Sequence, residues 1–226
     1  MNIHLEHVRS FKQGRSVPIR PLTLLVGQNS SGKSTFLAVV NAILDSGRFP
    51  LNPGFNEAPF NLGTFDTIAT YRGGKYGRDD TFSVGFSIES DKERLKREVI
   101  ATYNNVHGNP ALSELRVIGS GRSLNMKRNG EYFESETTSA PNGRRHKRIQ
   151  LKIPARMLSH ARGEFPFTPF QLAEESPEAY ETSWRLIDKQ AFYALESLFA
   201  ARAPYSGTLP VAPIRSKPKR TYAEIE

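Results

Sequence analysis

The chain has 226 residues, with 31 lysines and arginines against 23 aspartates and glutamates, and its formal net charge is +8. It has no cysteine, which excludes a disulfide framework and a cysteine-type zinc site. No apolar run approaches the roughly 20 residues that span a bilayer, and the N-terminus lacks the apolar core of a signal peptide. We therefore expect a cytoplasmic protein that does not contact membranes and whose partners are acidic.

Two short strands are predicted at the N-terminus. Residues 2–8 alternate polar and apolar side chains, with Ile3 and Leu5 on one side, which is typical of a half-exposed strand. A second strand is expected at residues 17–19.

A phosphate-binding motif follows these strands. Residues 23–26 are mostly apolar and predict a buried strand, and residues 34–44 carry apolar side chains at helical spacing. Between them, Gly27 to Ser34 form a complete G-x-x-x-x-G-K-S loop. The position of the loop between a strand and a helix is the one that phosphate binding requires.

The chemistry of such a loop predicts a nucleoside triphosphate as ligand. Its backbone N–H groups surround an anion, and the N-terminus of the next helix adds partial positive charge. Lys33 is expected to contact the β- and γ-phosphates, and the Ser34 hydroxyl to ligate Mg²⁺. The expected cofactors are therefore ATP and Mg²⁺, with Ser34 as the metal ligand. The loop residues expected to bind the nucleotide are Gly27, Gln28, Asn29, Ser30, Ser31, Gly32, Lys33, Ser34 and Thr35.

After the helix, the pattern changes from loop to strands. Residues 49–63 predict a loop, residues 64–71 a short helix and residues 72–80 a turn. Apolar residues then recur with period two, which predicts an antiparallel meander. Its strands are expected near residues 82–88, 99–103, 114–118, 123–127, 131–135 and 149–153. Asn129-Gly130 predicts a two-residue hairpin turn of type I′.

The last part of the chain is predicted to be helical. Ser176 and Pro177 are typical of a helix start, and an apolar stripe runs from Tyr180 to Leu198 at helical spacing. We divide the chain into a nucleotide-binding lobe at residues 1–175 and a helical segment with a basic tail at residues 176–226.

Three segments together resemble one group of ATPases. They are Val8-Arg9-Ser10-Phe11 with the phosphate loop, the sequence LGTFDTI at residues 62–68, and the sequence APIRSKPKRTY at residues 212–222. The chain resembles the N-terminal half of ABC-type ATPases of the SMC/RecF/OLD kind, which are often AAA-family proteins of bacterial anti-phage defence systems. The resemblance implies that Arg9 and Ser10 lie beside the nucleotide.

The same resemblance implies an α/β fold of the P-loop NTPase class. It consists of a mixed sheet around the P-loop helix, an antiparallel β-meander layer and a long C-terminal helix.

The chain also departs from the pattern of this group. Val8 stands where an aromatic residue is usual, and the sequence Leu158-Ser159-His160-Ala161 lacks the glycine of the signature motif. No run of four apolar residues ends in Asp-Glu, so the chain has no Walker B motif. In-line attack on ATP also needs a carboxylate that positions water. No catalytic residue is identifiable beyond Lys33, and hydrolysis is expected only of the intact protein or with a partner.

Three functions stay open from the sequence. The first is a dimeric or higher oligomeric ATPase that clamps ATP between two copies and signals to a nuclease, a toxin or DNA. The second is a non-hydrolysing nucleotide-binding scaffold that organises partner proteins. The third is a small-molecule kinase with Arg144, Arg145 and Arg148 in a lid. The basic residues that could contact nucleic acid are Arg144, Arg145, Lys147 and Arg148.

Overall fold

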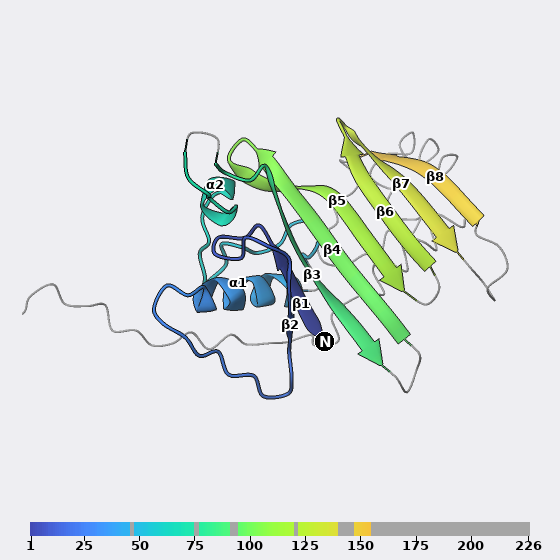
Figure 1. The fold of residues 1–226 in the computed structure, drawn as a ribbon. Coiled ribbons are helices and arrows are strands. Elements are labelled where there is room, and N and C mark those ends of the chain that lie inside the picture. Colours follow the sequence, from blue (N-terminus) through green and yellow to red (C-terminus); the bar gives the residue numbers. More distant parts are fainter. Residues whose placement is uncertain (46–47, 75–76, 91–94, 120–121, 140–146, 155–226) are drawn as a thin grey trace, which may run out of the picture.

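The computed structural model describes residues 1–45, 48–74, 77–90, 95–119, 122–139 and 147–154, and these form one large sheet with two helices (Figure 1). The sheet has eight strands in the order β2-β1-β3-β4-β5-β6-β7-β8. The strands are β1 (Asn2–Glu6), β2 (Arg15–Pro18), β3 (Thr81–Ser90), β4 (Leu95–Val106), β5 (Asn109–Gly119), β6 (Arg122–Asn129), β7 (Tyr132–Ser139) and β8 (Lys147–Pro154). The helices are α1 (Lys33–Leu44) and α2 (Phe65–Ile68).

The predicted strands and helices within this part of the chain are confirmed, except for the strand predicted at residues 23–26 before the phosphate loop. The mixed sheet, however, is wrong, because every strand pair among the described residues is antiparallel. From β3 onward, each strand follows its neighbour through a short connection, and such connections join only antiparallel strands. The meander is also no separate layer, since β3 pairs directly with β1 in the same sheet.

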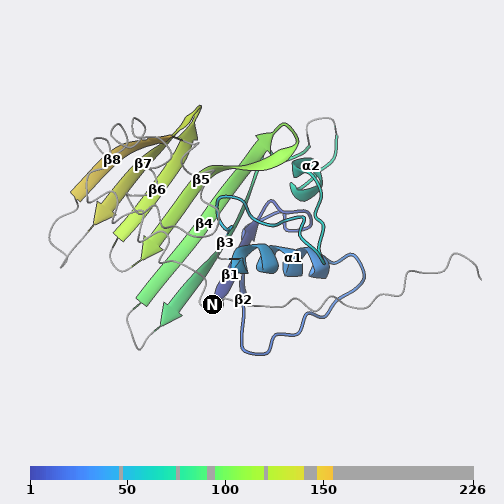
Figure 2. The same cartoon turned by 180° about the vertical axis from the view of Figure 1, so that it is seen from behind.

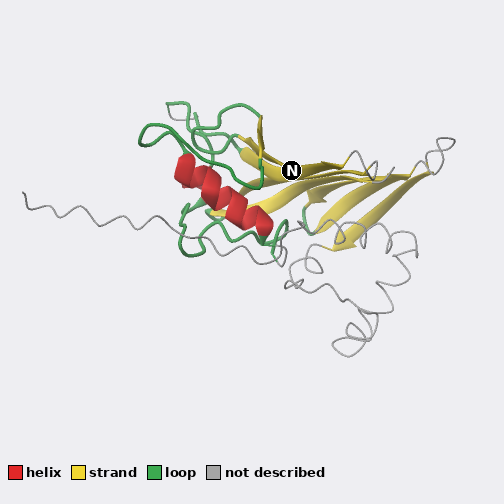
Figure 3. Cartoon of the chain, turned by 90° about the horizontal axis from the view of Figure 1, so that it is seen from below, coloured by secondary structure: helices red, strands yellow, loops and turns green. Residues whose placement is uncertain are grey.

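The two faces of the sheet differ because side chains alternate along each strand. Helix α1 lies across one face of the sheet, which Figure 3 shows from below. Phe82, Val84 and Phe86 of β3, which α1 contacts, are buried in the core. Ser83 and Ser87 lie on the opposite face, where the Ser83 hydroxyl contacts the Thr102 hydroxyl of β4 at 2.9 Å. Both helices lie at the β1–β3 end, and β6 to β8 extend away from them (Figures 1 and 2). The phosphate-loop helix is therefore attached to the first strands of the sheet.

A cluster of aromatic rings fills the core between the sheet and α2. The Phe82 ring centroid lies 5.6 Å from that of Phe55, 5.5 Å from that of Phe65 and 5.3 Å from that of Tyr103. The Tyr103 hydroxyl donates to the Pro50 carbonyl oxygen at 2.6 Å. Burial raises the pKa of Tyr103 well above its ordinary value, since a phenolate would lose its hydration there. The cluster thus joins β3 and β4 to α2 and to the segment between α1 and α2, which contains Pro50 and Phe55.

The β6–β7 hairpin differs from its predicted turn by one residue. Asn129 pairs with Tyr132, so the two turn residues are Gly130 and Glu131. Gly130 has a φ of 60°, whereas Glu131 is not among the residues with positive φ. A type I′ turn needs positive φ at both positions, while type II′ needs it only at the first, where glycine is preferred. The hairpin was predicted correctly, but its turn type and register were not.

Gly85, in the middle of β3, leaves no room for a side chain. It pairs with His4 of β1 and Ile100 of β4, and a Cβ atom there would overlap the Val99 carbonyl oxygen. We expect Gly85→Ala to lower the free energy of unfolding by about 1–3 kcal/mol, because a central strand must move to accept the methyl group. Urea unfolding measures this change. In the control Gly14→Ala, the new Cβ lies 3.7 Å from Glu6, and a change beyond about 0.5 kcal/mol is not expected. Equal effects of the two substitutions would contradict the close packing of β3 on β4.

Two expectations concern residues outside this set. The long C-terminal helix and the second unit at residues 176–226 lie outside the described residues. Within the described part, the structure has no helix long and apolar enough to cross a membrane.

Candidate phosphate-binding site

The phosphate loop forms an exposed turn that leads directly into α1. Gly32 is the N-cap of α1 with a φ of 95°, and Ser30 has a φ of 63°. No described side chain caps this helix, and its first turn contains no acidic residue. The N–H groups and the positive end of the helix dipole are therefore available to an anion.

Lys33 folds back over the loop. Its Nζ donates to the carbonyl oxygens of Gly27 at 2.8 Å and Gln28 at 2.6 Å, and it lies 3.5 Å from the Ser31 hydroxyl. These partners are neutral, and an anionic phosphate oxygen would bind the ammonium more strongly. The lysine thus already lies at the loop that a phosphate would enter.

Gly32, the second glycine of the motif, packs against Ser10 and Phe11 in the segment that follows β1. A Cβ atom at Gly32 would lie 2.6 Å from Ser10 Oγ and 3.2 Å from the Phe11 ring. Both this contact and the positive φ require glycine at this position. The structure therefore places Ser10 beside the phosphate loop.

Arg9 lies next to the other end of the same loop. Its Nη1 donates to Thr35 Oγ1 at 3.3 Å, and its Nη2 donates to the Leu62 carbonyl oxygen at 2.8 Å. Burial lowers the pKa of the Arg9 guanidinium. The Arg9 side chain thus bridges the first turn of α1 and the backbone of the segment before α2.

The segment before the loop is the exception among the predicted elements. Residues 23–26 form no strand, and Leu22, Leu24 and Val26 are 79%, 78% and 91% exposed. A strand needs a neighbour for its backbone hydrogen bonds, and no described strand pairs with this segment. The prediction of a buried strand at residues 23–26 is wrong for this part of the chain, and three large apolar side chains are exposed beside the phosphate loop.

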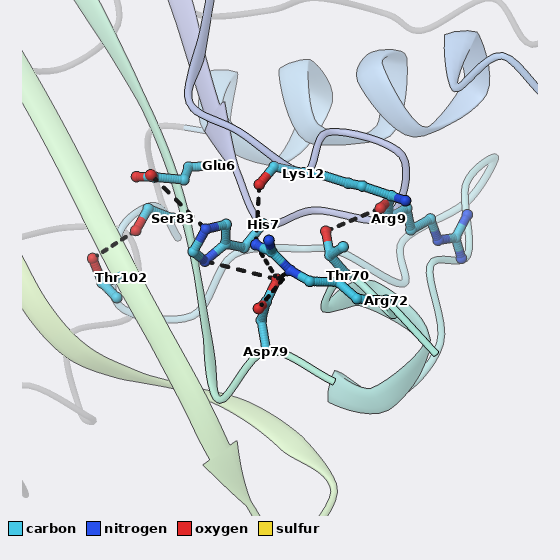
Figure 4. A network of polar contacts seen from close by, with 9 residues as sticks. All are labelled: Glu6, His7, Arg9, Lys12, Thr70, Arg72, Asp79, Ser83 and Thr102. Carbon is cyan, nitrogen blue, oxygen red and sulfur yellow. Dashed lines mark hydrogen bonds and ion pairs between the residues drawn. The ribbon is translucent and has the colours of Figure 1, made fainter. Parts of the chain in front are cut away.

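A polar cluster next to Arg9 was not found from the sequence (Figure 4). Asp79 accepts from Arg72 Nε at 3.2 Å and lies 3.9 Å from His7 Nδ1. Arg72 Nη2 also donates to the Lys12 carbonyl oxygen at 3.3 Å. Thr70 joins the cluster to the strand end, because its N–H donates to the His7 carbonyl oxygen at 2.9 Å. Only the fold brings these residues together, since the antiparallel bridge between Tyr71 and Arg78 places Arg72 beside Asp79.

Several predicted site residues are not brought together. Arg144 and Arg145 lie outside the described residues, as do the signature-like residues 158–161, while Lys147 and Arg148 begin β8. Among the described residues, no group of three or more histidines, aspartates and glutamates could hold a metal ion. Ser34 is exposed at the start of α1, and its role as an Mg²⁺ ligand stays a prediction.

Comparison with known proteins gives one match. The sequence model of a family described as an AAA domain matches residues 2–175. This range includes the phosphate loop, both helices and all eight strands. No curated protein matches the chain.

Proposed function

The chain belongs to the AAA domain family, and on this premise we propose that residues 27–35 bind ATP with Mg²⁺ in an ABC-type ATPase that works as a dimer. The observation that supports this proposal best is the exposed loop at the N-terminus of α1, with Lys33 already lying over it. The family accounts for a P-loop NTPase domain, and the dimer and its output are our proposal.

Three side-chain positions of the loop and its backbone have separate parts in the proposed binding. The backbone N–H groups at the start of α1 receive phosphate oxygens, and Lys33 exchanges the Gly27 and Gln28 carbonyl oxygens for charged ones. Ser34 offers its hydroxyl to Mg²⁺, which when bound neutralises charge on the phosphates. Gly32 keeps the loop close to Ser10, because no side chain fits between them. The residues present therefore fit MgATP.

The exposure of the loop supports a dimer. Residues 26–31 are exposed, and among the described residues no carboxylate contacts Lys33. Hydrolysis needs a group that orients water, and a second copy placed over the loop could supply it. ATP would then hold the two copies together, and hydrolysis would release them. We further propose that this cycle signals to a nuclease, a toxin or DNA, in anti-phage defence or DNA maintenance.

Nucleotide-dependent association tests this proposal. We expect the chain to be monomeric alone or with ADP and to sediment as a dimer with MgATP or a non-hydrolysable analogue. Sedimentation velocity gives the mass, calorimetry the affinity, and phosphate release the turnover. Binding of MgATP without association or turnover would favour the non-hydrolysing scaffold instead. Absence of any binding at millimolar MgATP would overturn the assignment of the phosphate loop itself.

A further inference from the structure

Arg9 connects the phosphate-loop helix to the segment that carries α2. Besides Thr35 Oγ1 and the Leu62 carbonyl oxygen, its guanidinium reaches the Thr67 carbonyl oxygen through Nε at 2.9 Å. Thr35 directly follows the predicted Mg²⁺ ligand Ser34 and is only 6% exposed. One acceptor lies in α1 and the other two in the segment of residues 62–67, and one planar side chain reaches all three.

The backbone of Arg9 is fixed to the same segment. Its N–H donates to the Ile68 carbonyl oxygen at 2.8 Å. Its own carbonyl oxygen accepts from Thr70 Oγ1 at 2.9 Å, and Figure 4 shows this second hydrogen bond. Its φ is 46°, a left-handed conformation that non-glycine residues seldom adopt. In Figure 4 the guanidinium extends away from the cluster around Asp79. The surrounding hydrogen bonds therefore determine the direction of this side chain.

We propose that Arg9 is a positioning residue, which holds the first turn of α1 against residues 62–70 and thereby couples the phosphate loop to α2. The inference rests on the proposed function and adds a role for a residue of the same site. Three of the five guanidinium N–H groups are used by Thr35, Leu62 and Thr67, and a lysine ammonium could not span these three acceptors. A phosphate ligand would need only a positive charge, whereas this role needs the shape of arginine.

The connection continues from α2 to the tip of the β4–β5 hairpin. The Phe65 N–H donates to the Gly108 carbonyl oxygen at 2.9 Å, and Asn105 Nδ2 lies 3.4 Å from Asp66 Oδ1. Hydrogen bonds and helix α2 thus link Thr35 through Arg9 to this hairpin.

Nucleotide binding at the phosphate loop is expected to slow amide hydrogen exchange in residues 62–70 and 105–109.

Affinity measurements with three substitutions test the positioning role. We expect Arg9→Ala, Arg9→Lys and Thr35→Val each to weaken MgATP binding about five-fold. Because Arg9 and Thr35 act through one contact, the double variant Arg9→Ala/Thr35→Val should bind about as well as either single variant. Multiplied effects, or full affinity in Arg9→Lys, would overturn the proposal and make Arg9 a direct phosphate ligand.

Hydrogen exchange provides a second readout with a matched control. MgATP should protect residues 62–70 in the natural chain but not in Arg9→Ala or Thr35→Val, at concentrations that saturate each variant. Arg78 is the control, because its guanidinium also donates to the Ala69 carbonyl oxygen, at 3.0 Å, without an observed contact to α1. Arg78→Ala should lower thermal stability yet keep both affinity and protection. If Arg78→Ala loses protection as Arg9→Ala does, the effect is general loosening and the proposal fails. If the natural chain does not bind MgATP, the proposed function fails first.

Discussion

Lys33→Ala is expected to weaken MgATP binding about 10- to 100-fold without lowering the stability of the fold. The loss corresponds to one charge-assisted contact with the β- and γ-phosphates, worth about 1.5–3 kcal/mol. Stability should not change, because the contacts of the Lys33 ammonium within the described part of the chain are to carbonyl and hydroxyl oxygens of its own exposed loop. Isothermal calorimetry with MgATP measures the affinity, and thermal unfolding measures the stability.

Lys127→Ala is the matched control for this experiment. It also removes one positive charge, but Lys127 pairs with Glu114 at 2.8 Å on the strands β6 and β5, away from the phosphate loop. We expect its affinity for MgATP to equal that of the natural chain. Equal affinity of Lys33→Ala and Lys127→Ala would show that the loop does not hold the phosphates.

Phe82→Ala is expected to lower the free energy of unfolding by about 3–5 kcal/mol, which is the largest stability effect that we predict. Phe82 is 1% exposed, and its ring contacts those of Phe55, Phe65 and Tyr103. Removing it leaves a cavity that none of the three rings can fill, since each is anchored in a different element. Urea unfolding followed by circular dichroism gives the value.

Tyr132→Ala serves as the control for the aromatic cluster. Tyr132 starts β7 and is 49% exposed, so its loss should change stability by no more than about 0.5 kcal/mol. A similar small effect of Phe82→Ala would mean that the aromatic cluster is not the core that holds α2 to the sheet.

Local patterns made much of the fold predictable. The alternation of Phe82, Val84 and Phe86 appears directly as the buried face of β3, because a strand reverses its side chains at each residue. The apolar spacing after Ser34 likewise predicts α1, and in the structure this helix begins at Lys33. The hairpin at Gly130 was found, but its register moved by one residue, since cross-strand pairing along β6 and β7 decides which residues form the turn.

Patterns failed where an element depends on a partner. Residues 23–26 have the composition of a buried strand, yet Leu24 and Val26 stay exposed because no described strand supplies hydrogen bonds to them. The mixed sheet was expected from the resemblance to known ATPases, whereas the described strands pair only in antiparallel fashion. Composition alone does not tell which segment a strand pairs with.

The phosphate loop from Gly27 to Ser34 and the helix behind it could be predicted from the sequence, because the glycine spacing and the lysine-serine pair lie within a few residues. The resemblance to known ATPases also implied that Arg9 and Ser10 lie beside the nucleotide, but the contacts that hold them there are defined only in the tertiary structure. Arg9 reaches Thr35 across 26 positions and Leu62 across 53, and Ser10 touches Gly32 through a contact that requires the absence of a side chain. Such contacts arise from the way the sheet and helices pack, and no local pattern encodes them.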